Sequence, residues 1–333
     1  MGNKRSKHSS RMMAQFTDFG VLEKMLQDPC ATPMCLPLDF LKAITLDFSE
    51  ERQLGGGGFG VVYKGVFESG KAIAVKRLRE MYIGHDQFEN EVTYLIELKH
   101  QNIIQLKGYC AESRWEASKV RDQKGKYVMT QKGERLLCFE YLHNGSLDKY
   151  LSDESSGLEW HMRYEMIRGI CCGLHYLHED CNIVHLDLKP ENILLDDNMI
   201  PKIADFGMSR LFGERQTRIF TEAPAGTPGY MAPEYLIDGL ISKKADMFSL
   251  GIIIIKLMTG SRDYPQRNDE ASLDQFVQNV VGNWSNRMKN IPRYIPLKVY
   301  THQVYTCIMT GLRCVNHDSN KRPTVSDVIE ELS

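Results

Sequence analysis

The spacing of apolar residues divides the chain into an N-terminal part of short strands and a C-terminal part of helices. Residues 36–49 carry apolar side chains at helical spacing. Residues 54–67 then indicate a strand, a glycine-rich turn and a second strand, and residues 72–78 are typical of another strand. The pattern therefore predicts a β-hairpin early in the chain.

One amphipathic helix should follow these strands. Within residues 88–99, apolar side chains recur at i, i+4, i+7 and i+8, which places them on one face of a helix. Two strand-like runs come next, at 103–109 and 136–141. Beyond Gly145 the long segments are mostly helical, including 162–178, 244–259 and 303–315.

These elements predict an α+β protein with two lobes. The smaller N-terminal lobe is rich in β-structure and has one main helix, and the larger C-terminal lobe is α-helical. The expected limits are a basic, flexible segment at 1–36, the N-lobe at 37–143 with an insertion at about 114–135, and the C-lobe at 144–333.

Composition favours a globular protein that does not bind nucleic acid. Hydrophobic residues make up 42% and charged residues 25% of the 333 residues, close to globular averages. The net charge of −2 gives no chain-wide basic field that would attract nucleic acid. The nine cysteines are scattered without C-x-x-C pairs, which indicates free thiols in a reducing compartment. Cys171 and Cys172 are expected to be thiols in a helix core.

The N-terminus indicates a contact with membranes. Gly2 and Ser6 fit the M-G-x-x-x-[ST] pattern for N-myristoylation, and four basic residues lie within the first eleven. An acyl chain together with a basic patch supplies the two signals that lasting attachment needs. The alternative is an unmodified basic tail. No secretory signal or membrane-spanning run is evident, so we expect a cytoplasmic protein, held at the inner face of the plasma membrane if Gly2 is acylated.

A glycine-rich segment is the first candidate for nucleotide binding. It contains G-x-G-x-x-G, in which glycines let backbone amides approach phosphates closely. A dinucleotide fingerprint would need a helix directly after the glycines, and the strand-like VVYKGVF follows instead. The candidate residues are Leu54, Gly55, Gly56, Gly57, Gly58, Phe59 and Gly60.

The next predicted strand offers a lysine for the phosphates. Ala74 and Lys76 are two residues apart and share a face of the strand. If that face meets a nucleotide, Ala74 and Val62 would pack on adenine while Lys76 reaches the phosphates. Glu91 is polar within the apolar spacing of the following helix, so it is a candidate ion-pair partner for Lys76.

Three motifs downstream are decisive. They are His185-Leu-Asp-Leu-Lys-Pro-Glu-Asn192, Asp205-Phe-Gly207 and Ala232-Pro-Glu234. In this order, and with Asp187 and Asp205 18 residues apart, they resemble the catalytic loop, the metal-binding loop and the A-P-E motif of protein kinases. The resemblance covers about Phe48 to Leu332.

The resemblance narrows to the plant receptor-like kinases. It rests on residues 38–60, 144–147, 226–230 and 321–324, and the stretch 158–210 is most similar to cysteine-rich receptor-like kinases. That family usually has an extracellular region and a membrane span, which this sequence does not show. The form expected from the resemblance is a receptor-like cytoplasmic Ser/Thr kinase.

The resemblance implies roles for individual residues. Asp187 would orient the substrate hydroxyl, Lys189 would lie beside the transferred phosphoryl group, and Thr227 would contact both. Asn192 and Asp205 would hold Mg²⁺, with Mn²⁺ as an alternative metal. ATP would meet the adenine contacts Val62, Ala74, Glu140, Leu142 and Leu194, with Phe139 as gatekeeper.

Other matches are expected to be structural. Glu234 and Arg322 should form a buried pair, and Asp246 should accept hydrogen bonds from amides of the catalytic loop. His185 should be a packed, hydrogen-bonded histidine.

Two features depart from the family pattern. Leu186 stands where the family usually has arginine, which predicts a non-RD kinase with less dependence on phosphorylation of Thr217 or Thr221. The insertion at 114–135 holds seven basic and three acidic residues. It is either a solvated hairpin extension or a docking surface for an acidic partner or anionic lipid.

Three functions remain to be compared. The first is a Ser/Thr protein kinase acting on protein substrates, with receptor kinases as expected partners in plant defence or stress signalling. The second is a catalytically weak, nucleotide-binding scaffold or decoy, which the presence of all five of Lys76, Glu91, Asp187, Asn192 and Asp205 disfavours. The third is a small-molecule kinase, which the A-P-E motif disfavours.

Overall fold

The computed structural model describes residues 19–28, 31–79, 85–119, 127–151, 158–213, 216–265, 270–289 and 296–333. Two compact units make up the chain. Unit 1 contains the residues up to Leu98 together with Gln105–Tyr141, and unit 2 contains Lys99–Ile104 and Leu142–Ser333. The expected N-terminal segment lies outside the described residues up to position 18, including the candidate acylation site at Gly2.

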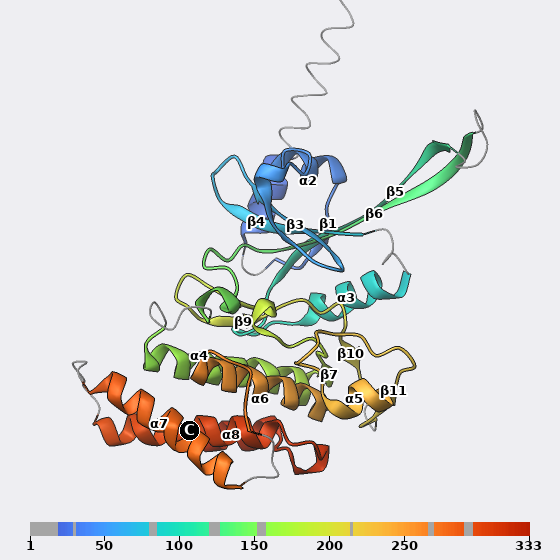
Figure 1. Cartoon of the computed structure of the whole chain (residues 1–333). Coiled ribbons are helices and arrows are strands. Elements are labelled where there is room, and N and C mark those ends of the chain that lie inside the picture. Colours follow the sequence, from blue (N-terminus) through green and yellow to red (C-terminus); the bar gives the residue numbers. More distant parts are fainter. Residues whose placement is uncertain are drawn as a thin grey trace, which may run out of the picture. The chain divides into compact units, whose positions relative to one another are not determined.

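Unit 1 is built on a six-stranded sheet with the order β1-β5-β6-β4-β3-β2 (Figure 1). Only the pair of β1 and β5 is parallel, and the other neighbours are antiparallel. The strands are β1 (Met34–Cys35), β2 (Gln53–Gly56), β3 (Gly60–Val66), β4 (Ala72–Leu78), β5 (Leu106–Lys119) and β6 (Tyr127–Glu140). The hairpin predicted from the glycine-rich pattern is confirmed as β2–β3.

Helices of unit 1 pack on this sheet. They comprise residues 19–27, α2 (Leu38–Ile44), the 3₁₀ turn η1 (Glu50–Arg52) and α3 (His85–Glu97). Phe40 and Leu41 of α2 join Val75 and Leu136 of the sheet in one apolar core, all of them at most 2% exposed. The helices predicted within 36–49 and 88–99 are confirmed as α2 and α3, although α2 ends at Ile44, earlier than predicted.

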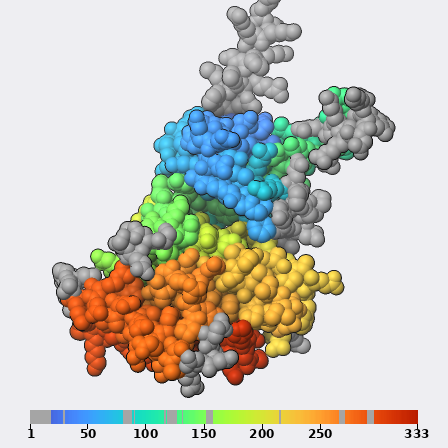
Figure 2. Space-filling model, viewed as in Figure 1, coloured from blue at the N-terminus to red at the C-terminus, as the bar shows by residue number. Residues whose placement is uncertain are grey.

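The hairpin formed by β5 and β6 is much longer than the predicted strands. The two strands pair from Leu106 and Phe139 out to Lys119 and Tyr127, whereas β6 pairs with β4 only over residues 136–140. In Figure 1 the outer part of both strands projects beyond the other strands of the sheet, and some of its green atoms are visible at the upper right of Figure 2. The insertion is thus a hairpin extension in its described part, and its tip, 120–126, lies outside the described residues.

Unit 2 is mainly helical. Its central helix is α6, whose residues Ile253, Ile254 and Ile255 are completely buried. The helices are α4 (Trp160–His175), which continues as one π-helical turn η4 (Tyr176–Asp180), α5 (Pro233–Asp238), α6 (Lys243–Thr259), α7 (Glu270–Met288), α8 (Leu297–Cys314) and α9 (Val325–Glu331). The 3₁₀ turns in the described part of unit 2 are η3 (Leu147–Tyr150), η5 (Pro190–Asn192) and η6 (Ser319–Lys321).

Three two-stranded sheets in unit 2 hold the segments that carry the motifs. They pair β7 (Ile183–Val184) with β10 (Arg210–Leu211), β8 (Ile193–Leu195) with β9 (Pro201–Ile203), and β11 (Ile219–Phe220) with β12 (Leu240–Ile241). None of the described helices is long and apolar enough to cross a bilayer. On α4, Cys171 is buried as expected, but Cys172 is exposed, so its assignment to the helix core was wrong.

Candidate active site

The glycine-rich turn leaves open space above its backbone. A Cβ added at Gly55 or Gly57 would meet nothing within 4 Å, whereas one at Gly60 would come within 2.4 Å of the Arg77 carbonyl oxygen. The Gly57 amide donates to the Gly60 carbonyl and closes the turn at 2.9 Å. Gly60 is therefore required by packing, and the first two glycines leave room in which a phosphate could approach the backbone.

Lys76 and Glu91 form a buried ion pair within unit 1. Lys76 Nζ lies 3.3 Å from Glu91 Oε1, and the residues are 8% and 2% exposed. The sheet register sets Val62 opposite Lys76, and Lys64 opposite Ala74, so these four side chains share one face of β3 and β4. The pairing inferred from the sequence is confirmed, and so is the common face of Val62, Ala74 and Lys76.

The end of β6 carries the expected gatekeeper, Phe139, and one expected adenine contact, Glu140. Phe139 is 8% exposed near the end of β6. The Glu140 amide donates to the Gln105 carbonyl at 3.0 Å, and the Gln105 amide donates to Glu140 Oε1 at 2.9 Å. Because the Glu140 N–H already donates to Gln105, the backbone of Glu140 can contact adenine only by accepting a hydrogen bond at its carbonyl oxygen. Leu142 and Leu194 belong to unit 2.

Asp246 of α6 fixes the backbone of the loop at residues 185–192 in unit 2. The amides of His185 and Leu186 donate to its two carboxylate oxygens at 2.7 and 2.8 Å. His178 Nε2 lies 2.9 Å from Asp246 Oδ2, and Asp246 is fully buried. The role expected of Asp246 is confirmed, while the contribution of His178 had no signal in the sequence because it depends on a π-helical turn.

His185 is a structural residue of this loop. It is fully buried, its Nε2 lies 3.0 Å from the Ala204 carbonyl, and its Nδ1 accepts from the Asp187 amide at 3.3 Å. Its ring meets that of Phe206 edge to face at 5.1 Å. The expectation of a packed, hydrogen-bonded histidine is confirmed.

Asp187 is the centre of a compact hydrogen-bond network. Its Oδ1 accepts from Thr227 Oγ1 at 2.7 Å, and its Oδ2 accepts from Lys189 Nζ at 2.8 Å and Asn192 Nδ2 at 2.9 Å. Lys189 Nζ also donates to Thr227 Oγ1 at 2.7 Å. The contacts expected between Thr227, Asp187 and Lys189 are therefore present, and they hold one carboxylate, one ammonium and one hydroxyl together.

Backbone contacts bring the two expected metal ligands into neighbouring segments. The Ala204 amide, next to Asp205, donates to the Asn192 carbonyl at 2.8 Å. Asn192 uses its amide nitrogen for the bonds to Asp187, so these bonds leave its side-chain oxygen unused. An amide oxygen and a carboxylate are hard ligands that suit Mg²⁺. Within the described residues, no group of three or more His, Cys, Asp or Glu forms a metal cluster.

The A-P-E motif anchors the segment that carries Thr227. Arg322 Nη1 and Nη2 donate to Glu234 Oε1 and Oε2 at 2.6 and 2.7 Å, and the Arg322 side chain is completely buried. The Tyr235 hydroxyl donates to the Ala225 carbonyl at 2.8 Å and accepts from the Ala225 amide at 3.1 Å. The expected Glu234–Arg322 pair is confirmed, and Tyr235 is a second anchor that sequence reasoning missed.

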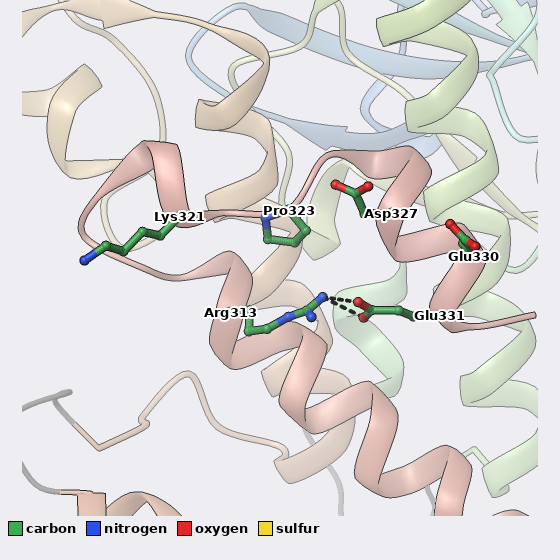
Figure 3. A pocket seen from close by; sticks show the side chains of 6 residues that line it. All are labelled: Arg313, Lys321, Pro323, Asp327, Glu330 and Glu331. Atoms are coloured by element: carbon green, nitrogen blue, oxygen red, sulfur yellow. Dashed lines mark hydrogen bonds and ion pairs between the residues drawn. The ribbon is translucent and has the colours of Figure 1, made fainter.

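A separate surface hollow in unit 2 has no features of a catalytic site. It has a volume of about 580 Å³ and is lined by residues of both charges from α8, η6 and α9 (Figure 3). Arg313 and Glu331 in its wall already pair with each other. The lining residues are Arg313, Lys321, Pro323, Asp327, Glu330 and Glu331.

Comparison with known proteins gives a consistent result. Residues 48–332 match the protein kinase domain family. The chain is 41% identical to receptor-like serine/threonine-protein kinase SD1-7 of Arabidopsis thaliana over 308 residues, which cover 89% of this chain and 34% of that protein. It is 40% identical to cysteine-rich receptor-like protein kinase 44 of the same plant over 309 residues, which cover 90% and 76%.

A third relative is similar over a comparable length. Cysteine-rich receptor-like protein kinase 41 of Arabidopsis thaliana is 39% identical over 321 residues, which cover 93% of this chain and 45% of that protein. The chain thus spans between one third and three quarters of the length of these three relatives.

Proposed function

The chain belongs to the protein kinase family, and from this premise we propose that it transfers the γ-phosphate of ATP to serine or threonine residues of protein substrates. The observation that carries the proposal is the network in which Thr227 and Lys189 both contact the carboxylate of Asp187. It supplies a proton acceptor, a cation and a fixed geometry in one place, which phosphoryl transfer requires. The names of the similar receptor-like serine/threonine kinases agree with it.

The reaction follows from these groups. The acceptor hydroxyl oxygen bonds to the γ-phosphorus, the bond from that phosphorus to the β,γ-bridging oxygen breaks, and ADP leaves with the electron pair. Asp187 orients the hydroxyl and accepts its proton, and Lys189 neutralises charge on the transferred group. Mg²⁺, held by Asn192 and Asp205, would offset negative charge on the phosphates when bound.

Residues of unit 1 are proposed to bind the nucleotide. Lys76 would contact its phosphates, and Glu91, 3.3 Å away, keeps the ammonium in place. The open backbone at Gly55 and Gly57 is where phosphate oxygens would approach amide groups. Val62 and Ala74, on the same sheet face as Lys76, would pack against adenine.

The test is incorporation of labelled γ-phosphate from Mg-ATP into a generic Ser/Thr protein substrate by the purified chain. Asp205→Ala and Lys76→Met are the matched inactive variants. We expect labelled serine or threonine with the native chain and none with either variant. If the native chain binds nucleotide but transfers no more labelled phosphate than the variants, the protein is instead a nucleotide-binding scaffold.

We also propose the regulation that Leu186 implies. Its side chain is 5% exposed and cannot pair with a phosphate, so phosphorylation of Thr217 or Thr221 should change activity little. Leu186→Arg should make activity more sensitive to phosphatase treatment. Equal sensitivity of the two proteins would contradict this proposal.

Partners and location are proposals as well. The similarity to receptor-like kinases supports receptor kinases as partners in plant signalling. Gly2 and the basic residues after it support attachment to the inner face of the plasma membrane. Gly2→Ala should shift the protein from the membrane fraction of cells to the soluble fraction, and an unchanged distribution would exclude acylation as the anchor.

A further inference from the structure

The outer part of the β5–β6 hairpin is a two-stranded ribbon. Residues 111–119 pair with 127–135, and no other strand among the described residues pairs with either segment. Two-stranded ribbons are marginally stable alone in water. None of the residues proposed to bind the nucleotide lies in this ribbon, so the ribbon is expected to have another role.

One face of the ribbon is apolar and exposed. The register sets Ala117 opposite Met129, and Trp115 and Tyr127 lie two positions away on their strands, so all four share a face. Trp115, Met129 and Tyr127 are 65%, 60% and 57% exposed. Large side chains exposed together on one face are typical of an interaction surface.

Charge identifies the partner. In the sequence, residues 119–126 include four Lys or Arg and one Asp, and Lys119 pairs in register with Tyr127 on the aromatic face. Other basic side chains are neutralised: Arg77 pairs with Glu134, and Arg114 pairs with Asp39. The sequence therefore carries excess positive charge between β5 and β6, and the register position of Lys119 brings part of it to the aromatic face.

We propose that this ribbon binds the surface of an anionic lipid bilayer, with Trp115, Tyr127 and Met129 in the interface. Tryptophan and tyrosine favour the headgroup region because they combine an apolar ring with a polar group. Lysine and arginine add attraction to anionic lipids, about fivefold in affinity for each residue near the surface. An acidic protein could complement the charge, but the exposed aromatic face favours a bilayer.

Tryptophan fluorescence can test this directly. The chain has three tryptophans, and Trp160 and Trp284 are only 4% and 5% exposed, so Trp115 is the one that lipid can reach. The full chain, produced without N-acylation, would be mixed with phosphatidylcholine vesicles with or without phosphatidylserine. We expect sedimentation with the anionic vesicles only, and quenching of Trp115 by brominated acyl chains. Trp115→Phe should still sediment but lose the quenching.

Variants separate the ribbon from other basic segments. Trp115→Ser with Met129→Ser should weaken vesicle binding about tenfold, equivalent to about 1.4 kcal/mol. The control pair Leu236→Ser and Ile237→Ser removes similarly exposed apolar side chains from α5 and should have no effect. Lys119→Glu, opposite Tyr127 in the register, should weaken the preference for phosphatidylserine by at least about fivefold.

Several outcomes would overturn the proposal. Failure of the native chain to sediment is one, and sedimentation without quenching of Trp115 is another, because it would assign binding to the N-terminal basic residues. An equal loss in the α5 control would show a general effect of exposed apolar side chains. Binding to polyglutamate but not to vesicles would identify an acidic protein as the partner. None of these outcomes depends on kinase activity.

Discussion

Asp187 shows how much a single carboxylate depends on its neighbours. Three donors from Lys189, Asn192 and Thr227 fix both of its oxygens, while Asp246 fixes the backbone on its N-terminal side. Charge-assisted hydrogen bonds of this kind are short and directional. A carboxylate held in this way would need little reorganisation to accept a proton in the proposed reaction.

Thr227 offers a sharp test of this network. Thr227→Val keeps the shape of the side chain but removes the hydroxyl that donates to Asp187 and accepts from Lys189. We expect kcat to fall about 10- to 100-fold, since one positioned hydrogen bond is worth about 1.5–3 kcal/mol when a partner is charged. Thr227→Ser should recover most of the activity. Steady-state kinetics decide the matter, and a Val variant with native kcat would remove Thr227 from the site.

His100 should make the stability of unit 2 depend on pH. Burial lowers the pKa of its imidazole, whose Nδ1 accepts a hydrogen bond from the Asn102 amide at 3.0 Å. Because the folded pKa is below the unfolded one, the unfolded chain takes up the proton first. The contribution of neutral His100 to the free energy of unfolding is thus complete above the unfolded pKa of about 6.5. This contribution is lost as the pH falls toward the folded pKa.

The variant His100→Phe isolates this effect. It preserves a ring to stack on Tyr176, whose centroid is 5.0 Å away, but cannot accept a hydrogen bond or titrate. The free energy of unfolding should differ most between native and variant proteins at pH 8, and the difference should shrink below pH 6.5. Urea titrations across this range measure it. A difference that is the same at every pH would contradict the assignment.

Sequence reasoning succeeded at the residue scale where a motif fixed both identity and spacing. Asp187 is one example, because its expected contacts with Lys189 and Thr227 are present, and Glu234 is another, because its expected partner Arg322 lies 88 positions away. It missed His178 and Tyr235, because their contacts depend on how a π-helical turn and a short helix are placed in space. No local pattern records that placement.

At the scale of elements, two helices of unit 2 approach closely at glycine. A Cβ at Gly251 of α6 would come within 2.8 Å of the Gly311 carbonyl oxygen of α8 and 2.7 Å of Cys314 Cβ. The helix core has no room for these atoms, because protein interiors are packed as densely as organic crystals. The close contact of α6 and α8 thus depends on the absence of a side chain.

This packing predicts opposite effects at two helical glycines. Gly251→Ala should destabilise the protein by about 1–3 kcal/mol through overpacking. Gly282→Ala, in α7, meets nothing within 4 Å and should stabilise it by up to about 1 kcal/mol through helix propensity. Chemical denaturation of both variants gives the comparison. Equal effects would show that propensity, not the α6–α8 contact, controls the response at Gly251.

The length of β5 and β6 was beyond sequence prediction for a physical reason. Polar and charged residues dominate 111–119 and 127–135, and with no core to cover, the alternation that marks a half-buried strand is weak. The predicted strand 103–109 also began too early, since Ile103 forms only an isolated bridge and β5 starts at Leu106. By contrast, α4, α6 and α8 bury apolar faces and were predicted near their observed positions.

At the scale of the whole molecule, the fold class followed from the order of patterns along the chain. Short alternating segments precede long helical ones, and the structure separates them into a sheet-based unit 1 and a helical unit 2. The assignment of Lys99–Ile104 to unit 2 could not be foreseen, because it rests on contacts such as that of the Ile104 amide with the Ile203 carbonyl. The residues proposed to bind the nucleotide belong to unit 1 and those proposed to bind the metal belong to unit 2, so ligand-induced stabilisation tests both proposals.

A magnesium–nucleotide complex should raise the melting temperature of the native chain. A ligand at 100 times its Kd stabilises the folded state by about 2.7 kcal/mol, equivalent to about 5–10 °C for a domain of 150–250 residues. We expect this shift with ADP and Mg²⁺ and a smaller one when EDTA removes the metal. Asp205→Ala should eliminate the difference between the two conditions, because it removes a carboxylate ligand, and Lys76→Met should weaken the response to nucleotide. Lys71→Met, which alters an exposed lysine just before β4, should respond as the native chain does. If neither EDTA nor Asp205→Ala changes the shift in melting temperature, nucleotide binds without the metal site proposed for Asn192 and Asp205.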